Sequence, residues 1–137
     1  MNPIILDERL SAAAELAREA LAGREAPVAA DVGCDHGFLT AKLLEIVPGL
    51  TMLASDVSAP SLEKARRLLG ARGLSERANI TVADGLSAVD RPVDAVMILG
   101  MGSGTYASYC TRYFPGASVQ GAEIDKKIAD IATDYFG

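Results

Sequence analysis

The sequence predicts an α/β fold in which a doubly wound parallel sheet of about five strands carries helices on both faces. Short apolar runs that fit buried strands alternate along the chain with segments of helical periodicity. A glycine turn joins the run at 28–32 to a helical pattern that begins at Phe38, as in the strand–turn–helix unit of a nucleotide site. Half of the residues are hydrophobic but only 5% are aromatic, which is typical of a parallel sheet packed between helices.

The first half of the chain is expected to open with a helix over 7–22, because Asp7 can cap it and Gly23 follows its last turn. Its buried face is expected to contain Leu10, Ala13, Leu16, Ala17, Ala20 and Leu21. The elements expected next are strands at 28–32, 52–56 and 79–82, a helix that begins at Phe38 and a helix over 61–69.

The second half resembles the first at an offset of 67 positions, with no gap between equivalent turns. This offset maps Gly33 onto Gly100 and Asp56 onto Glu123. It predicts strands at 95–99 and 118–123, a helix over 105–114 and a final helix.

Two similar βαβ halves are what a doubly wound sheet requires. We therefore expect a single domain over 1–137, made of halves at about 28–70 and 95–137 with the helix 7–22 in front. Right-handed crossovers then give a Rossmann-like strand order of 3-2-1-4-5.

The formal net charge of −5 means that the overall field does not favour a polyanion. One basic cluster lies on the outer face of the helix at 61–69 and continues just after it, and acidic neighbours dilute it, so a solvated helix face is the favoured interpretation. Its members are Lys64, Arg66, Arg67, Arg72 and Arg77.

Two cysteines, Cys34 and Cys110, lack metal-ligand spacing and no secretory signal is present, so we expect free thiols, a cytoplasmic location and no metal site. Glycine and proline interrupt every apolar run well before the length of a membrane span, so no membrane association is expected.

The candidate ligand site lies where the predicted strands end. Gly33 and Gly37 bound the turn after the first strand, but Asp35 stands where a dinucleotide fingerprint usually has its middle glycine. Asp56 ends the second strand, where an acidic side chain can accept hydrogen bonds from ribose hydroxyls. Asp84 follows the third strand on the same rim. Glycines let a backbone approach a ligand closely, so we expect a nucleotide-type ligand here.

Four segments in order resemble the bacterial tRNA (adenine-N1)-methyltransferases, a class I family that uses S-adenosylmethionine. They are 31–39, 54–57, 83–86 and 94–102, and the resemblance covers about 5–102. The pair Asp35-His36 within the glycine turn and the run Gly100-Met101-Gly102 make it fairly specific.

The remainder, about 95–137, resembles the first nucleotide-binding module of spermidine synthases. The segments that carry this second resemblance are 98–104, 112–116, 121–125 and 132–137. A front that resembles one family and a tail that resembles another indicate a recombined or engineered chimera, or else an unusual natural member.

The methyltransferase resemblance implies a role for each matched position. The glycine turn would surround the methionine part of S-adenosylmethionine, Asp56 would hold the ribose, Asp84 and Gly85 would contact the adenine, and Gly100 and Met101 would face the transferred methyl group. The full set of implied cofactor-binding residues is Asp31, Gly33, Asp35, His36, Gly37, Asp56, Val57, Asp84, Gly85, Gly100 and Met101.

Asp35 is the one catalytic candidate, as a group that orients the acceptor amine, because a ring nitrogen already carries a lone pair and needs no strong base. His36, the sole histidine, is either a general base or a structural residue of the loop, and the structural role is favoured.

Three functions stay open from the sequence: a methyltransferase core, a non-catalytic Rossmann scaffold with at most weak nucleotide binding, and a dinucleotide-dependent oxidoreductase in which Glu123 mirrors Asp56. The tRNA methyltransferases continue into a helical arm that this chain lacks, so we expect tRNA to bind weakly. An exposed edge strand or an exchanged tail would favour a homodimer.

Overall fold

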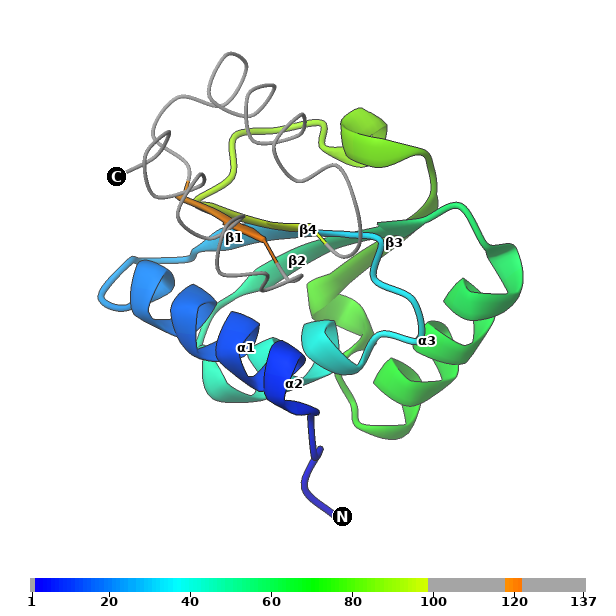
Figure 1. The fold of residues 1–137 in the computed structure, drawn as a ribbon, viewed down its shortest axis with the longest axis horizontal. Helices are drawn as coiled ribbons and strands as arrows, with labels where there is room; N and C mark the ends of the chain where they lie inside the picture. Colours follow the sequence, from blue (N-terminus) through cyan, green and yellow to red (C-terminus); the bar gives the residue numbers. More distant parts are fainter. Residues whose placement is uncertain (1, 99–117, 122–137) are drawn as a thin grey trace.

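The computed structural model describes residues 2–98 and 118–121 of the chain, and its centre is a parallel sheet (Figure 1). The strand order is β3-β2-β1-β4-β5, so the predicted succession of the first four strands is confirmed. The strands are β1 (Val28–Val32), β2 (Thr51–Asp56), β3 (Ala78–Val82), β4 (Ala95–Ile98) and β5 (Ser118–Gly121). All neighbouring pairs run parallel, and β1 at the centre pairs with both β2 and β4.

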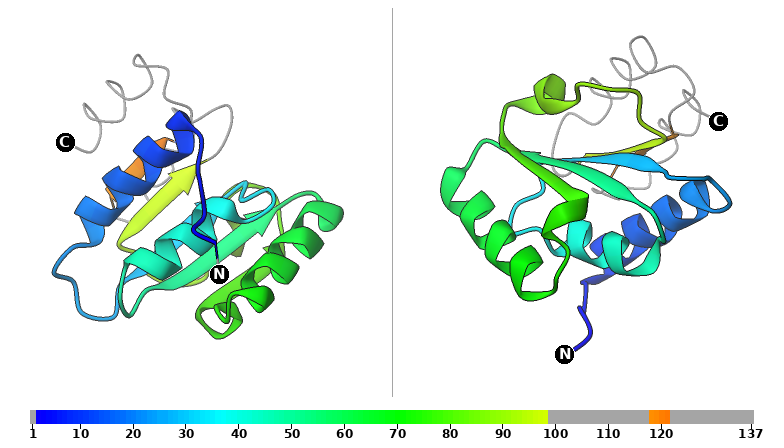
Figure 2. Two further views of the ribbon diagram at one scale, coloured as in Figure 1. Left: turned by 90° about the horizontal axis from the view of Figure 1, so that it is seen from below. Right: turned by 180° about the vertical axis from the view of Figure 1, so that it is seen from behind.

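Three α-helices lie on one face of the sheet, where they form a layer beneath its strands, with α3 on the side of β3 (Figures 1 and 2). They are α1 (Glu8–Leu21), α2 (Phe38–Ile46) and α3 (Ala59–Ala71), and two short 3₁₀ turns, η1 (Ser75–Arg77) and η2 (Gly85–Ala88), flank β3. The predicted cap is confirmed, since the Asp7 carboxylate accepts a hydrogen bond of 2.8 Å from the backbone N–H of Leu10. Ser58 caps α3 in the same way.

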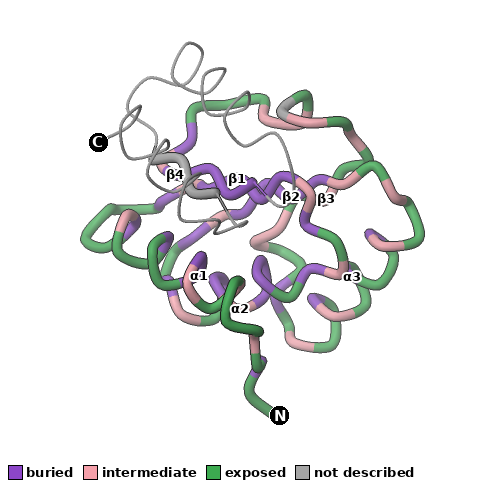
Figure 3. Tube along the Cα trace, viewed as in Figure 1, coloured by how far each residue is buried: buried purple, intermediate pink, exposed green. Residues whose placement is uncertain are grey.

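Successive side chains along the strands point alternately into two apolar layers. The buried residues are concentrated in β1, β2 and β4 (Figure 3). Side chains that face the helices join one core cluster, whose strand members are Ala29, Met52, Ala54, Ala95 and Met97. Those that face the other way form a second cluster with Val93. Its strand members are Ala30, Val32, Leu53, Val96 and Ile98. Strands buried on both sides are expected of a parallel sheet.

One side chain of α1 contradicts the predicted buried face. Leu16 is 40% exposed, whereas Ala14, which is not part of the predicted face, is buried. The buried residues of the helix include Ala13, Ala14 and Ala17, whose small side chains let it approach its neighbours closely. With these alanines buried, Leu16 lies outside the buried face. Hydrophobic periodicity alone does not determine this rotation of α1 about its axis.

The basic cluster on and after α3 is only in part a solvated surface, so the sequence interpretation was wrong for two of its members. The guanidinium of Arg77 donates hydrogen bonds to the carbonyls of Leu44, Val47 and Leu50, at 2.8, 2.9 and 3.0 Å. Arg72 pairs with Glu45 at 2.6 Å. Both side chains therefore bind near the end of α2: Arg77 through carbonyls at the helix C-terminus, which attract cations, and Arg72 through the carboxylate of Glu45.

The strand positions fit the offset of 67, because β1 begins at residue 28 and β4 at 95, and β2 begins at 51 and β5 at 118. The second glycine turn, the helix expected over 105–114, the final helix and Cys110 lie outside the described residues. The division into two equivalent halves therefore stays a prediction.

Candidate active site

The loop between β1 and α2 is a turn with three positive φ angles. Gly33, Asp35 and Gly37 have φ values of 78°, 52° and 84°. The backbone N–H groups of Gly33 and Cys34 both donate to the carbonyl of Ser55 at 2.8 Å, which fastens the turn to the end of β2. A left-handed conformation is unusual for a residue with a Cβ, so Asp35 is held there by its surroundings.

Gly37 is required for packing as well as for the turn. A Cβ at this position would lie 2.8 Å from the Cβ of Ala65 on α3. The residue that precedes α2, its N-cap, therefore has to be glycine, because a side chain would push α2 away from α3.

Asp56 is the acidic side chain that connects β2 to the glycine turn. One carboxylate oxygen accepts a hydrogen bond from the backbone N–H of Asp35, and the other accepts one from the backbone N–H of Ser58, both at 2.9 Å. Each carboxylate oxygen can accept more than one hydrogen bond. Asp56 therefore holds the turn and still has acceptor capacity for a ligand.

Asp31 is a second acidic side chain, and it is completely buried on the helix side of β1. Its Oδ2 accepts a hydrogen bond of 2.6 Å from the hydroxyl of Thr40 on α2. Its Oδ1 has no partner within the described part of the chain. Burial raises the pKa of Asp31 to about 6, with repulsion from Asp56 adding to the shift and the Thr40 hydrogen bond opposing it.

Cys34 is a buried free thiol in the same turn. Its pKa is raised, first by burial and then by the nearby negative charges of Asp31 and Asp56. A thiol with a raised pKa carries little thiolate at neutral pH, so Cys34 is a packing residue rather than a nucleophile.

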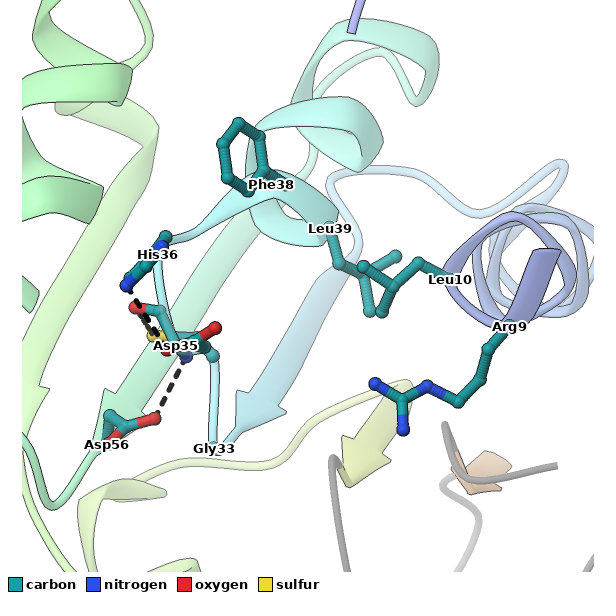
Figure 4. A pocket seen from close by; sticks show the side chains of 9 residues that line it. Arg9, Leu10, Gly33, Asp35, His36, Phe38, Leu39 and Asp56 are labelled. Carbon is teal, nitrogen blue, oxygen red and sulfur yellow. Dashed lines mark hydrogen bonds and ion pairs between the residues drawn. The ribbon is translucent and has the colours of Figure 1, made fainter. Parts of the chain in front are cut away.

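A pocket of about 350 Å³ opens over this turn (Figure 4), a volume in the range of small-molecule sites. Its polar side chains are Asp35, His36, Asp56 and Arg9, and Nε2 of His36 lies 3.6 Å from Oδ1 of Asp35. The complete lining is Arg9, Leu10, Gly33, Cys34, Asp35, His36, Phe38, Leu39 and Asp56.

The structure brings together four of the residues singled out from the sequence, since Gly33, Asp35, His36 and Asp56 all line this pocket. Asp31 and Gly37 are buried and do not line it. Asp31 faces the helix layer, and Gly37 packs against Ala65.

The positions near β3 are on the same rim but outside the pocket lining. Val57 is 67% exposed, directly after Asp56. The backbone N–H of Ala83 donates to the carbonyl of Asp56 at 3.1 Å, which places Asp84 and Gly85 just beyond the end of β2. Gly100 and Met101 lie outside the described residues.

Sequence reasoning missed Arg9 and Phe38 as pocket residues. Arg9 directly precedes Leu10, which is predicted to face inward, and this position next to the buried face could have indicated that Arg9 lies near the site. Within the described residues, no group of histidine, cysteine or acidic side chains is arranged to hold a metal ion. Each helix that the structure describes is too short or too polar to cross a lipid bilayer.

Comparison with known proteins identifies the family. The profile of the family described as "Methyltransferase domain" matches residues 6–113, which includes α1, the glycine turn and β4. The chain belongs to this methyltransferase family. The pocket of the methyltransferase domain lies at the carboxyl ends of β1 and β2, where open α/β sheets bind their ligands.

Individual proteins and structures that resemble this chain share about a fifth to a third of the aligned residues with it. A probable polyamine aminopropyl transferase of Bifidobacterium longum is 32% identical over 102 residues, which are 74% of this chain and 19% of that protein. The tRNA methyltransferase TrmK of B. subtilis, described as acting at m1A22, superposes with a TM-score of 0.68 at 21% identity. That superposition covers 85% of this chain and 50% of TrmK.

TrmK of M. capricolum, solved with S-adenosylhomocysteine, gives a TM-score of 0.65 at 24% identity over 82% of this chain and 49% of that one. The two TrmK superpositions show the fold alone. The methyltransferase domain spans about half the length of these structures, and about a fifth of the curated relative.

Proposed function

We propose that this chain forms the S-adenosylmethionine-binding core of a class I methyltransferase that modifies N1 of adenine in tRNA. The observation that carries the proposal is the meeting of Asp56 and the glycine turn in one pocket of a methyltransferase domain. Two similar structures support it, one described as a tRNA m1A22 methyltransferase and one solved with S-adenosylhomocysteine.

The residues of the pocket fit such a cofactor. Asp31 lies beneath the pocket without lining it, and its buried carboxylate has an oxygen without a partner among the described residues. The positive charge of a ligand ammonium group bound above it would offset its negative charge. Gly33 has no side chain and leaves the turn open at the pocket. Asp56 has acceptor capacity for two ribose hydroxyls.

The adenine would lie toward β3 in this proposal. Val57 offers an exposed apolar side chain next to the ribose-binding Asp56, suited to the face of a flat ring. Asp84 and Gly85 follow on the same rim and would contact the ring edge. Gly100 and Met101 are proposed to face the methyl group, on the strength of the sequence resemblance.

S-adenosylmethionine supplies a methyl group on a positively charged sulfur, so the task of the protein is alignment of donor and acceptor. Asp35 is proposed to orient the acceptor, because its side chain is 66% exposed at the pocket rim while its backbone is fixed to Asp56. A carboxylate there accepts a hydrogen bond from the exocyclic amine of adenine. His36 lies beside it and is the alternative contact.

Binding measured by calorimetry tests the proposal. S-adenosylhomocysteine should bind the wild-type chain and NAD should not. Asp56→Ala should weaken this binding by roughly 1.5–3 kcal/mol, the range for hydrogen bonds to a charged group. Asp90→Ala is a matched control, because Asp90 is an exposed acidic residue away from the pocket.

Equal affinity of the Asp56→Ala variant and the wild type would overturn the ribose assignment, and selective binding of NAD would favour the oxidoreductase alternative. Cofactor binding without transfer to tRNA would favour the non-catalytic scaffold. Asp35→Asn separates binding from turnover: asparagine tolerates a positive φ, so cofactor affinity should persist while tRNA methylation falls by about 10-fold or more.

Aminopropyl transfer is the second candidate function, because one relative is described as a polyamine aminopropyl transferase. That match extends over 102 residues and is therefore longer than the tail at 95–137 that carries the spermidine synthase resemblance. The likeness thus reaches beyond the tail, and the chimeric origin of the chain stays a prediction. Preferential binding of decarboxylated S-adenosylmethionine would favour this function.

A further inference from the structure

Arg9 places a positive charge in a pocket whose other charged residues are acidic. Among the residues that line the pocket in the described part of the chain, Arg9 is the only arginine or lysine, and the acidic residues of the lining are Asp35 and Asp56. Within those same residues it forms no ion pair with a carboxylate. Its side chain extends from α1 into the pocket, on the side toward Gly33 (Figure 4).

The backbone of Arg9 is fixed by the first turn of α1. Asp7 accepts hydrogen bonds of 2.8 Å from Leu10 through its side chain and from Ser11 through its carbonyl. Leu10 packs against the core that α1 shares with α2. The start of α1 is therefore a fixed support, and only the side chain of Arg9 has to adjust to a ligand.

Charges of opposite sign occupy separate parts of the pocket. Arg9 and Asp56 lie apart on the two sides of Gly33 in the close view (Figure 4). Asp56 is proposed to hold the ribose, so the far side of the turn is left for the amino-acid end of the same molecule. That end carries a carboxylate as well as an ammonium group, and acidic residues alone would repel the carboxylate.

We propose that Arg9 binds the α-carboxylate of the methionine part of S-adenosylmethionine and thereby selects the complete amino acid over its decarboxylated form. This inference rests on the proposed cofactor. A guanidinium matches a carboxylate with two parallel hydrogen bonds, which is the reason for arginine at such positions. Decarboxylated S-adenosylmethionine leaves Arg9 without this partner, so Arg9 favours methyl transfer over aminopropyl transfer.

The experiment compares two ligands that share the adenosine and the thioether, of which only one has the carboxylate that Arg9 would contact. S-adenosylhomocysteine contains the amino acid, and 5′-methylthioadenosine keeps the adenosine and the thioether but lacks it. Calorimetry on the Arg9→Gln variant should show an affinity for S-adenosylhomocysteine that is lower by about 10- to 100-fold, with affinity for 5′-methylthioadenosine unchanged. Arg9→Lys should lose less, because the charge remains without the planar fork.

Arg18→Gln is the matched control on the same helix, since Arg18 pairs with Glu15 on an exposed surface and does not line the pocket. It should bind both ligands as the wild type does. Circular dichroism should show that all three variants are folded.

Three outcomes overturn the inference. Unchanged affinity of Arg9→Gln for S-adenosylhomocysteine, with loss of tRNA binding, would assign Arg9 to an RNA phosphate. Equal loss of both ligands would assign it to the adenosine part or to the fold. Wild-type binding of neither ligand would refute the proposed function and this inference together, whereas the first two results leave the proposed function intact.

Discussion

The hydroxyl of Thr40 donates a hydrogen bond of 2.6 Å to the carboxylate of Asp31, and both side chains are completely buried. This bond joins α2 to the centre of the sheet directly beneath the glycine turn. It satisfies one carboxylate oxygen, and the other has no partner among the described residues. A buried carboxylate in this state makes folding sensitive to pH.

Asp31 should lower the stability of the protein as the pH rises from about 4 to about 6. Its pKa is raised from the ordinary value of 3.8 to about 6, so in this interval the folded state keeps a proton that the unfolded chain has lost. Folding is therefore favoured at the lower pH, and the effect is complete above about 6. Asp31→Asn should remove this dependence and raise the free energy of unfolding at pH 7.5 by roughly 1–3 kcal/mol. Urea unfolding of the wild type and of Asp31→Asn at several pH values measures the free energy of unfolding. If this free energy changed with pH in the same way in both proteins, the prediction would be contradicted.

Gly37→Ala should destabilise the fold by roughly 2–4 kcal/mol, because it adds a contact of 2.8 Å with Ala65 to the strain of a positive φ. Gly23→Ala is the control for strain alone, since Gly23 also has a positive φ but no atom within 4 Å of the added Cβ. It should cost about 1 kcal/mol. The double variant Gly37→Ala with Ala65→Gly should recover the part due to contact, and no recovery would show that backbone strain dominates.

Arg77→Ala should destabilise the protein by roughly 2–4 kcal/mol, because three carbonyls near the end of α2 lose their donor. Arg67→Ala should change stability by no more than about 0.5 kcal/mol, since that side chain is 77% exposed. Thermal or urea unfolding of both variants measures the difference. Equal effects would mean that water replaces the Arg77 hydrogen bonds without loss.

A homodimer through the edge of the sheet, or through an exchanged tail, stays a prediction. Within the described residues β5 ends the strand order and pairs with β4, and the unpaired backbone groups of an edge strand can pair with a second chain. Light scattering after gel filtration should give twice the monomer mass, and Val119→Lys should shift it to monomer. Val82→Lys tests the opposite edge on β3; if that variant alone dissociates the dimer, the interface is not at β5.

The arrangement of strands could be predicted because it follows from patterns within the chain. Apolar runs, turn residues and right-handed crossovers together fix the order of β3, β2, β1 and β4. The rotation of α1 could not, since a helix rich in alanine has several faces of similar hydrophobicity. Leu16 was therefore assigned to the core, where Ala14 lies instead.

The acidic and glycine residues of the site could be predicted because strand ends and turns place them locally. Arg9 and Arg77 could not, because their partners lie far along the chain. Arg77 binds carbonyls about 30 residues earlier in the sequence, and Arg9 meets the glycine turn only after α1 packs on α2. In the sequence alone, Arg9 and Arg77 cannot be distinguished from arginines that only face solvent.

The hydrogen bond from the backbone of Asp35 to Asp56 has a kinetic consequence. Because Asp56 holds the turn in one conformation before any ligand arrives, the entropy of ordering that loop is lost during folding rather than during association. Ligand binding should then occur in one step. In stopped-flow fluorescence, the observed rate constant should rise linearly with ligand concentration. Removing the Asp56 carboxylate would add a slow ordering step, and the observed rate would level off at high concentration.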